Sequence, residues 1–244
     1  MGQTALATRS RRVSSWALKV VMAVTGLIWA LFVLIHLFGN LKAFTGPEHF
    51  NTYAHWLREA FTPFLPAGAV LWSLRMVLLL ALVLHLWAAA TLNWRSRRAR
   101  GTRARTGVRR RLRRGRSSLF ALPSLMPVTG LLILAFLLFH LLDLTVGWQP
   151  AATSAFVPAT GETSSAYQNL VTSLQRPWVA AGYAATMILL SLHLGQGLRS
   201  AATDLGATGS RVRLAAAWGA GLVALAILLG NGLLPVAVQL GVVK

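Results

Sequence analysis

Five long apolar blocks divide the chain, and polar or basic stretches separate them. A helix needs roughly 20 apolar residues to cross the hydrocarbon layer of a bilayer, and every block exceeds this length. Charged residues make up only 12% of the 244 residues, about half the share of a soluble domain. The blocks predict an all-α membrane protein with five transmembrane helices, at about 16–40, 68–93, 120–144, 177–198 and 214–241.

These spans define one integral-membrane domain, residues 16–241, behind a basic N-terminus of residues 1–15. The N-terminus has no obvious small-residue cleavage site, and the apolar stretch after it is too long for a signal peptide. We therefore interpret that stretch as the first span. The sequence contains no cysteine, which excludes disulfides, iron–sulfur clusters and thiolate zinc sites on this chain.

Basic residues are concentrated on one side of the predicted bundle. The N-terminus together with Lys19 at the start of the first span, the loop of residues 94–118 and the segment between the last two spans carry 19 of the 24 Lys and Arg residues. The positive-inside rule makes this side cytoplasmic, so the N-terminus lies inside and the C-terminus outside. The net charge is +19. We interpret the basic residues as a signal that sets the topology and as contacts for anionic lipid headgroups, rather than as a nucleic-acid-binding surface. Docking of an acidic cytoplasmic partner on the loop is an open alternative.

Spans one and three share a sequence repeat. Residues 22–27 read Met-Ala-Val-Thr-Gly-Leu and residues 126–131 read Met-Pro-Val-Thr-Gly-Leu, and each glycine stands ten residues before a histidine, His36 or His140. Spans two and four share a shorter Leu-His-Leu match. The first four spans are therefore interpreted as two copies of one hairpin, with the fifth span added.

Each of the first four spans carries one histidine, an expensive residue inside a membrane that usually faces the bundle interior. At 1.5 Å per residue, two of them lie about 30 Å from the cytoplasmic ends of their spans, and the other two about 12 and 9 Å. These depths predict an outer pair, His36 with His140, and an inner pair, His85 with His193. Facing neutral imidazoles are what a six-coordinate haem b iron needs, so the prediction is a four-helix bundle holding two haems b.

Three further residues in the spans are candidates for contact with the haems. Gly26 and Gly130 lie about 15 Å below the outer histidines, near the level of the inner pair. Their missing side chains would leave room for the inner macrocycle or allow close helix packing, and the sequence does not separate the two. Arg75 lies inside the second span, where it would snorkel to the outer interface or pair with a haem propionate.

The connection between the first two spans contains a predicted amphipathic helix at about 47–61. Its apolar residues recur at intervals of three and four, which is typical of a helix lying on the outer interface. We hypothesise that Glu59, with His55 or His49, handles protons for a quinone bound beside the outer haem. For any one of these residues, the simpler interpretation is a solvated position on a surface helix.

Val-Thr-Gly precedes the first histidine, His-Leu-Phe-Gly-Asn-Leu occupies residues 36–41, and Phe-Asn-x-Tyr occupies residues 50–53. In these motifs the chain resembles the single, di-haem cytochrome b subunit of succinate dehydrogenases and fumarate reductases that use menaquinone. The resemblance covers the first four spans. It also rests on the four histidines and on the 49-residue step from His36 to His85.

The resemblance implies that His36 and His140 hold the distal haem, and that His85 and His193 hold the proximal one. It also implies a flavoprotein with FAD and an iron–sulfur protein, both bound on the cytoplasmic face of a bacterial cell membrane. Succinate would be oxidised in the flavoprotein, because this chain has no flavin or dicarboxylate motif. Electrons would then pass through the iron–sulfur clusters and both haems to menaquinone.

One residue departs from the family. Some members carry a glutamate two residues before the fourth histidine for transmembrane proton return; here that residue is Ser191, which puts the pathway in doubt. Glu59 does resemble an acidic residue that the family places near the distal haem.

Two other functions fit the same residues. The first is the di-haem cytochrome b of a hydrogenase or formate dehydrogenase. The second is a transporter whose histidines bind metal or relay protons. A higher oligomer of the complex is compatible with each of the electron-transfer readings.

Overall fold

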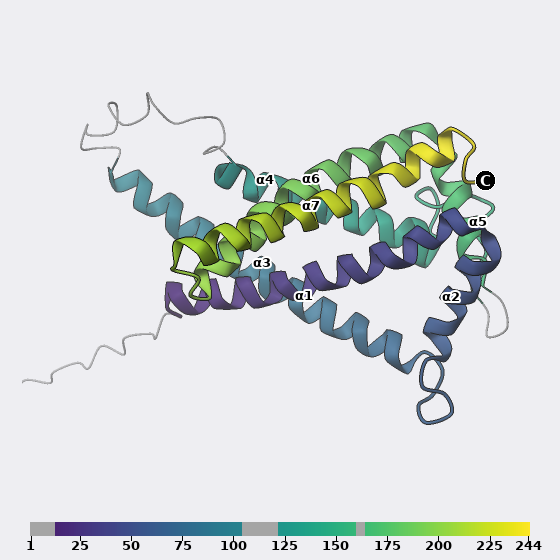
Figure 1. The fold of residues 1–244 in the computed structure, drawn as a ribbon, viewed down its shortest axis with the longest axis horizontal. Helices are drawn as coiled ribbons and strands as arrows, with labels where there is room; N and C mark the ends of the chain where they lie inside the picture. The colour runs from purple at the N-terminus through teal and green to yellow at the C-terminus, as the bar shows by residue number, and fades with distance from the viewer. Residues whose placement is uncertain (1–12, 104–121, 160–163) are drawn as a thin grey trace, which may run out of the picture.

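The protein is an all-α, multi-pass membrane protein, as the sequence predicts. In the computed structural model, residues 13–103, 122–159 and 164–244 are described, and this part of the chain contains no strand (Figure 1). Five of its helices are long and apolar enough to cross a membrane. They are α1 (Ser15–Leu41), α3 (Ala69–Arg103), α4 (Leu122–Leu141), α6 (Pro177–Asp204) and α7 (Ser210–Gln239).

Two spans start where capping chemistry favours a helix, and α3 and α6 extend beyond the ends that apolar content predicts. Ser14 caps α1 by accepting the Ala17 N–H at 3.1 Å, and Pro177 occupies the first turn of α6, where its missing N–H is not needed. Helix α3 continues to Arg103, so residues 94–103 of the expected basic loop are helical instead. The rest of that loop, residues 1–12 of the basic N-terminus and the expected start of the third span at 120–121 lie outside the described residues.

Two short helices lie together at one end of the bundle (Figure 1). Helix α2 (Pro47–Glu59) is the amphipathic helix that the sequence predicts, and it ends two residues earlier than expected. Helix α5 (Ala166–Leu174) is not predicted, because nine residues carry too little periodicity to identify. It packs on α2, and Asn51 joins them by accepting the Tyr167 N–H at 2.9 Å.

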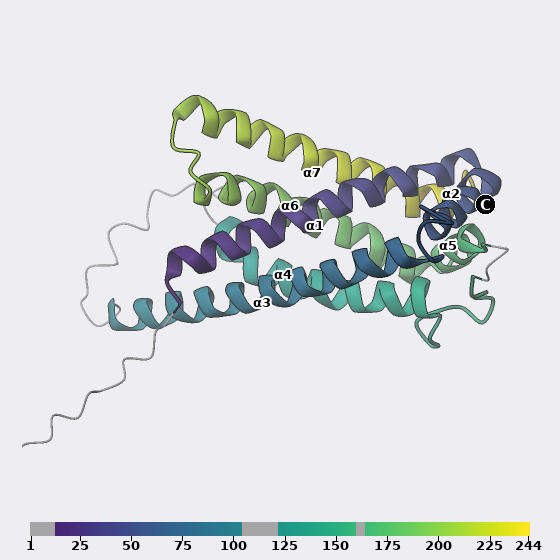
Figure 2. The same ribbon diagram turned by 90° about the horizontal axis from the view of Figure 1, so that it is seen from below.

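The packing of the long helices places α1 opposite α4. Helix α1 packs against α3, α6 and α7, and α4 packs against α6, while α6 and α7 form the most extensive pair (Figure 2). The four histidine-bearing helices therefore surround a common interior, and α7 covers the side formed by α1 and α6. Large apolar side chains such as Leu31 and Leu222 stay exposed, as expected of surfaces that face lipid.

Candidate functional site

The outer histidines face each other across the bundle. The ring centroids of His36 on α1 and His140 on α4 lie 6.0 Å apart, with the ring planes at 81°. Two metal–imidazole bonds of about 2 Å each would span about 4 Å, and the radii of the two rings account for most of the remainder. Each ring stacks on a phenylalanine four residues earlier, Phe32 at 5.5 Å and Phe136 at 5.9 Å.

The inner histidines are each held by a threonine from the neighbouring hairpin helix. Thr25 Oγ1 lies 3.1 Å from His85 Nδ1, and Thr129 Oγ1 lies 3.0 Å from His193 Nδ1. Each threonine donates its hydroxyl proton to a backbone carbonyl of its own helix, at 2.7 Å from Thr25 to Val21. The hydroxyl oxygen is then left to accept from Nδ1–H, which leaves Nε2 of each imidazole with a lone pair for a metal.

The glycines of the repeat make room for imidazole rings. A Cβ added to Gly26 would stand 3.3 Å from Cε1 of His85, and one added to Gly130 would stand 3.3 Å from Cε1 of His193. Both positions are tighter than ordinary van der Waals contact, so a side chain there would push the ring aside. The histidine ring is what an added Cβ would meet at either glycine. The two interpretations from the sequence, room for a macrocycle or close helix packing, stay predictions.

His140 is tied to a buried carboxylate through Tyr183. The Tyr183 hydroxyl lies 3.2 Å from His140 Nδ1 and 3.0 Å from Oδ2 of Asp143, to which it donates its proton. As with the threonines, the phenolic oxygen is left to accept from Nδ1–H, so Nε2 is again the nitrogen left for a metal. The hydrogen bonds from His140 through Tyr183 end on a carboxylate, whereas those from the inner histidines end on a neutral carbonyl. A charged acceptor makes hydrogen bonds stronger.

Asp143 is fully buried and is compensated from two sides. Arg176 pairs with Oδ1 at 2.8 Å, and Ser173 donates to Oδ2 at 2.5 Å. A buried charge is stable only with such partners, and breaking the pair typically costs about 3–5 kcal/mol. The sequence pattern alone singles out neither Asp143 nor Tyr183. A carboxylate three residues after a span histidine was the available signal, because residues three apart share a helix face.

The proposed quinone residues lie on α2 without polar partners. His49 is exposed, while His55 and Glu59 are half-buried. Within the described residues, none of these three side chains makes a hydrogen bond or an ion pair. The structure therefore places them on one helix, at the end of the bundle where α2 and α5 pack together, and does not join them into a relay.

Two arginines at the outer end lie close enough to influence each other. Burial and the nearby Arg75 guanidinium lower the pKa of the Arg58 guanidinium. The Arg75 guanidinium lies over the ring of Trp72, 4.8 Å from the ring centroid. Trp72 stands three residues before Arg75, nearer the N-terminal end of α3. This position accords with the snorkelling alternative for Arg75.

Two buried polar atoms on the histidine-bearing helices have no partner among the described residues, Trp29 Nε1 and Ser191 Oγ. Trp29 lies on α1 between Thr25 and His36, and so between the two histidine levels. A buried donor without an acceptor costs about 1–3 kcal/mol. An acceptor group bound between the levels would remove that cost at Trp29.

Comparisons of the chain with protein-family models, curated proteins and solved structures gave no match. What the site does is therefore inferred from its own residues.

Proposed function

We propose that this chain is a di-haem cytochrome b, the membrane anchor of a succinate dehydrogenase that reduces menaquinone. The observation that carries the proposal is the hydrogen bonding of the histidine rings. His85, His193 and His140 each have Nδ1 engaged by a hydroxyl, so the opposite nitrogen is left for a metal. Histidines arranged for packing alone would need no common tautomer.

The residues fit haem at both levels. At the outer level, diagonal helices supply facing imidazoles that would both bind one iron. At the inner level, the two histidines lie on the other diagonal, each with Nδ1 beside a threonine hydroxyl. His36 with His140 would hold the outer group, and His85 with His193 the inner one. Haem b, when bound, supplies a one-electron iron couple at each level. The chain's own contribution is to orient the rings through Thr25, Thr129 and Tyr183 and to surround them with apolar side chains that exclude water.

The direction of electron flow follows from the orientation of the chain in the membrane, which the basic residues set. The basic ends of the spans favour a cytoplasmic N-terminus and an outer C-terminus, in a bacterial cell membrane. The inner pair then lies nearer the cytoplasm, where an iron–sulfur subunit and an FAD-containing flavoprotein would dock and succinate would be oxidised. The outer pair lies beside α2, where Glu59, His55 and His49 would pass protons to menaquinone.

The pairing of the histidines favours this function over metal transport. Among the described residues, no three His, Asp or Glu side chains gather closely enough to hold a metal ion. A small cation bound only by protein usually takes more ligands than a pair of imidazoles provides. The facing pair of His36 and His140 suits a haem, which would need only two ligands from the protein. A cytochrome b for hydrogenase or formate dehydrogenase would use the same ligands, and the difference between them lies in the partner.

The experiment is to purify the full chain from cells with adequate haem supply and to record reduced-minus-oxidised spectra. We expect a reducible haem b band, and copurification with a flavoprotein that oxidises succinate. A colourless protein would refute the cytochrome. If a red protein copurifies instead with a hydrogenase or formate dehydrogenase subunit, the haem assignment stands and the proposed succinate dehydrogenase partner is wrong.

A further inference from the structure

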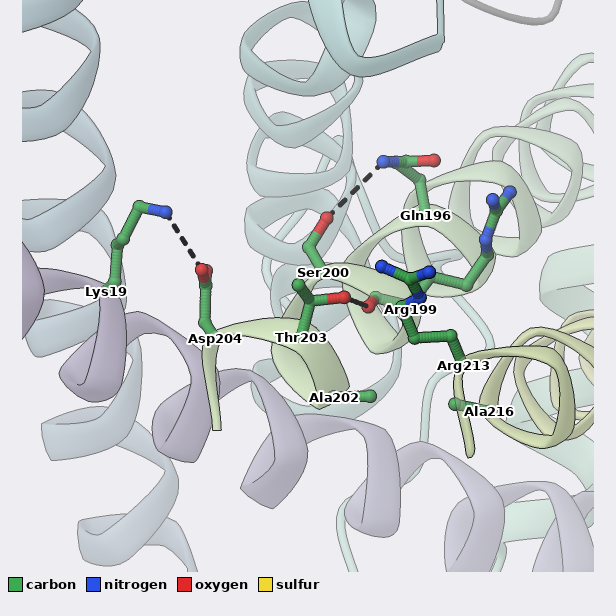
Figure 3. A pocket seen from close by; sticks show the side chains of 9 residues that line it. All are labelled: Lys19, Gln196, Arg199, Ser200, Ala202, Thr203, Asp204, Arg213 and Ala216. Atoms are coloured by element: carbon green, nitrogen blue, oxygen red, sulfur yellow. Dashed lines mark hydrogen bonds and ion pairs between the residues drawn. The ribbon is translucent and has the colours of Figure 1, made fainter. Parts of the chain in front are cut away.

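A polar pocket of about 440 Å³ opens at the ends of α1, α6 and α7 that the positive-inside rule makes cytoplasmic (Figure 3). Figure 2 shows α7 leaning away from α6 towards its own N-terminal end, on the side of the pocket. The pocket carries three cationic side chains, Lys19, Arg199 and Arg213, and one carboxylate, Asp204. None of these residues is needed to orient a histidine.

Only some of the charged side chains in the pocket are paired with an opposite charge. Lys19 and Asp204 neutralise each other at 2.9 Å. Arg199 and Arg213 are exposed, and within the described residues neither guanidinium has an ion-pair partner. Figure 3 shows the two guanidinium groups on one side of the pocket and the Lys19–Asp204 pair on the other. The pocket therefore keeps two unopposed positive charges.

Neutral groups in the pocket add a hydrogen-bond donor. Ser200 Oγ accepts from Gln196 Nε2 at 3.3 Å, which leaves the Ser200 hydroxyl proton free to donate. The Thr203 hydroxyl is already committed to the Arg199 carbonyl at 3.1 Å. Two guanidinium forks and a hydroxyl donor suit an oxyanion with several oxygens, above all a phosphate.

The depth of the pocket identifies the source of that phosphate. Exposed tryptophans stand close by along two of its helices, Trp16 three residues before Lys19 and Trp218 two residues after Ala216. Exposed tryptophan marks the headgroup layer of a membrane, and basic pockets between spans on the cytoplasmic side suit anionic headgroups. We propose that this pocket binds the phosphate of an anionic phospholipid of the inner leaflet, through Arg199 and Arg213.

The test uses the full chain reconstituted in nanodiscs of mixed phosphatidylglycerol and phosphatidylcholine, followed by native mass spectrometry of the released protein. Wild type is expected to retain phosphatidylglycerol in preference to phosphatidylcholine. Arg199→Gln and Arg213→Gln are each expected to reduce that retention about fivefold, from the free energy of one basic residue near an anionic surface. Arg211→Gln is the matched control, since Arg211 is an exposed arginine of the same helical turn that does not line the pocket.

Three results would overturn the proposal. Equal loss of lipid in Arg211→Gln would mean that net charge alone holds it. Displacement by added inorganic phosphate would assign the pocket to a soluble oxyanion. Loss of haem from the Arg199→Gln/Arg213→Gln variant, with lipid retention unchanged, would assign it to haem propionates. Lipid retention is measured on protein with or without haem, so failure here is distinguishable from failure of the proposed function.

Discussion

The inner and outer histidine pairs occupy the same four helices but are supported differently. At the inner level, His85 and His193 are each held by a threonine whose hydroxyl ends on a neutral backbone carbonyl. At the outer level, His140 is held through a tyrosine that ends on an ionised carboxylate. Within the described residues, no hydrogen bond reaches the ring of His36, which is stacked on Phe32. The two inner supports share the same threonine contact and end on neutral groups, with a further backbone contact of Met22 at His85. The outer support is one-sided and ends on a charge.

The internal repeat explains where the two levels diverge. Counting 104 residues back along the first span of each copy takes Thr129 to Thr25, so the inner support is the same in both. The same step takes Asp143 to Gly39, and a step of 108 residues along the second span takes Tyr183 to Arg75. The outer support therefore exists in one copy only. This difference lies at the level where we propose that the quinone reacts.

The largest expected effect is the loss of one haem per histidine pair. His85→Ala or His193→Ala should remove the inner haem and leave the outer one, because the outer ligands lie on the other diagonal of the bundle. His36→Ala or His140→Ala should do the reverse. Haem per chain, measured as the pyridine haemochrome, should fall from two to one in each variant. Loss of different haems from the two members of a pair would refute the pairing.

A large side chain at either repeat glycine should weaken the inner level alone. Gly26→Leu or Gly130→Leu would displace the imidazole that lies 3.3 Å from the added Cβ. Disturbing the support of a ligand typically costs about 10–100-fold in metal affinity. Haem titration of the apoprotein measures this loss. Gly182→Leu is the matched control, because nothing lies within 4 Å of a Cβ at that helical glycine. An equal loss in the control would indicate a general helix effect.

Tyr183→Phe should change the outer level without emptying it. Phenylalanine removes the hydrogen bond to His140 and its link to the charge of Asp143, so the imidazole becomes a weaker electron donor to iron. We expect the reduction equilibrium of the outer haem to shift about tenfold towards the reduced form, about 59 mV for one electron. Potentiometric titration separates the two haems. Tyr167→Phe, whose hydroxyl bonds the Lys244 carbonyl instead, should leave both potentials unchanged.

The sequence is sufficient to predict the spans and to propose a depth for each histidine, and it does not predict the residues that support the histidine rings. Hydropathy and a rise of 1.5 Å per residue fix depth, and the repeat groups the histidines. The role of the threonines depends on the rotation of each helix about its own axis, which decides the side chains that meet. The spacing of residues along the sequence does not determine this rotation. Asp143 and Tyr183 are 40 residues apart, so their contact depends on how α4 and the π-helical turn Leu142–Val146 that continues it dock on α6. Helix α5 is missed because it is short.

The smallest expected effect tests the symmetry of the inner level. Thr25→Val or Thr129→Val keeps the shape of the side chain and removes the acceptor for Nδ1–H, at a distance of 3.1 or 3.0 Å. A neutral hydrogen bond contributes about 1 kcal/mol, so each variant should lose inner-haem affinity only several-fold, and the two losses should be equal. The outer haem should keep its potential in both. Thr186→Val is a suitable control, since that hydroxyl bonds only the Gly182 carbonyl. Unequal losses would show that the two halves of the repeat no longer share one support, and that the asymmetry of the outer level extends to the inner one.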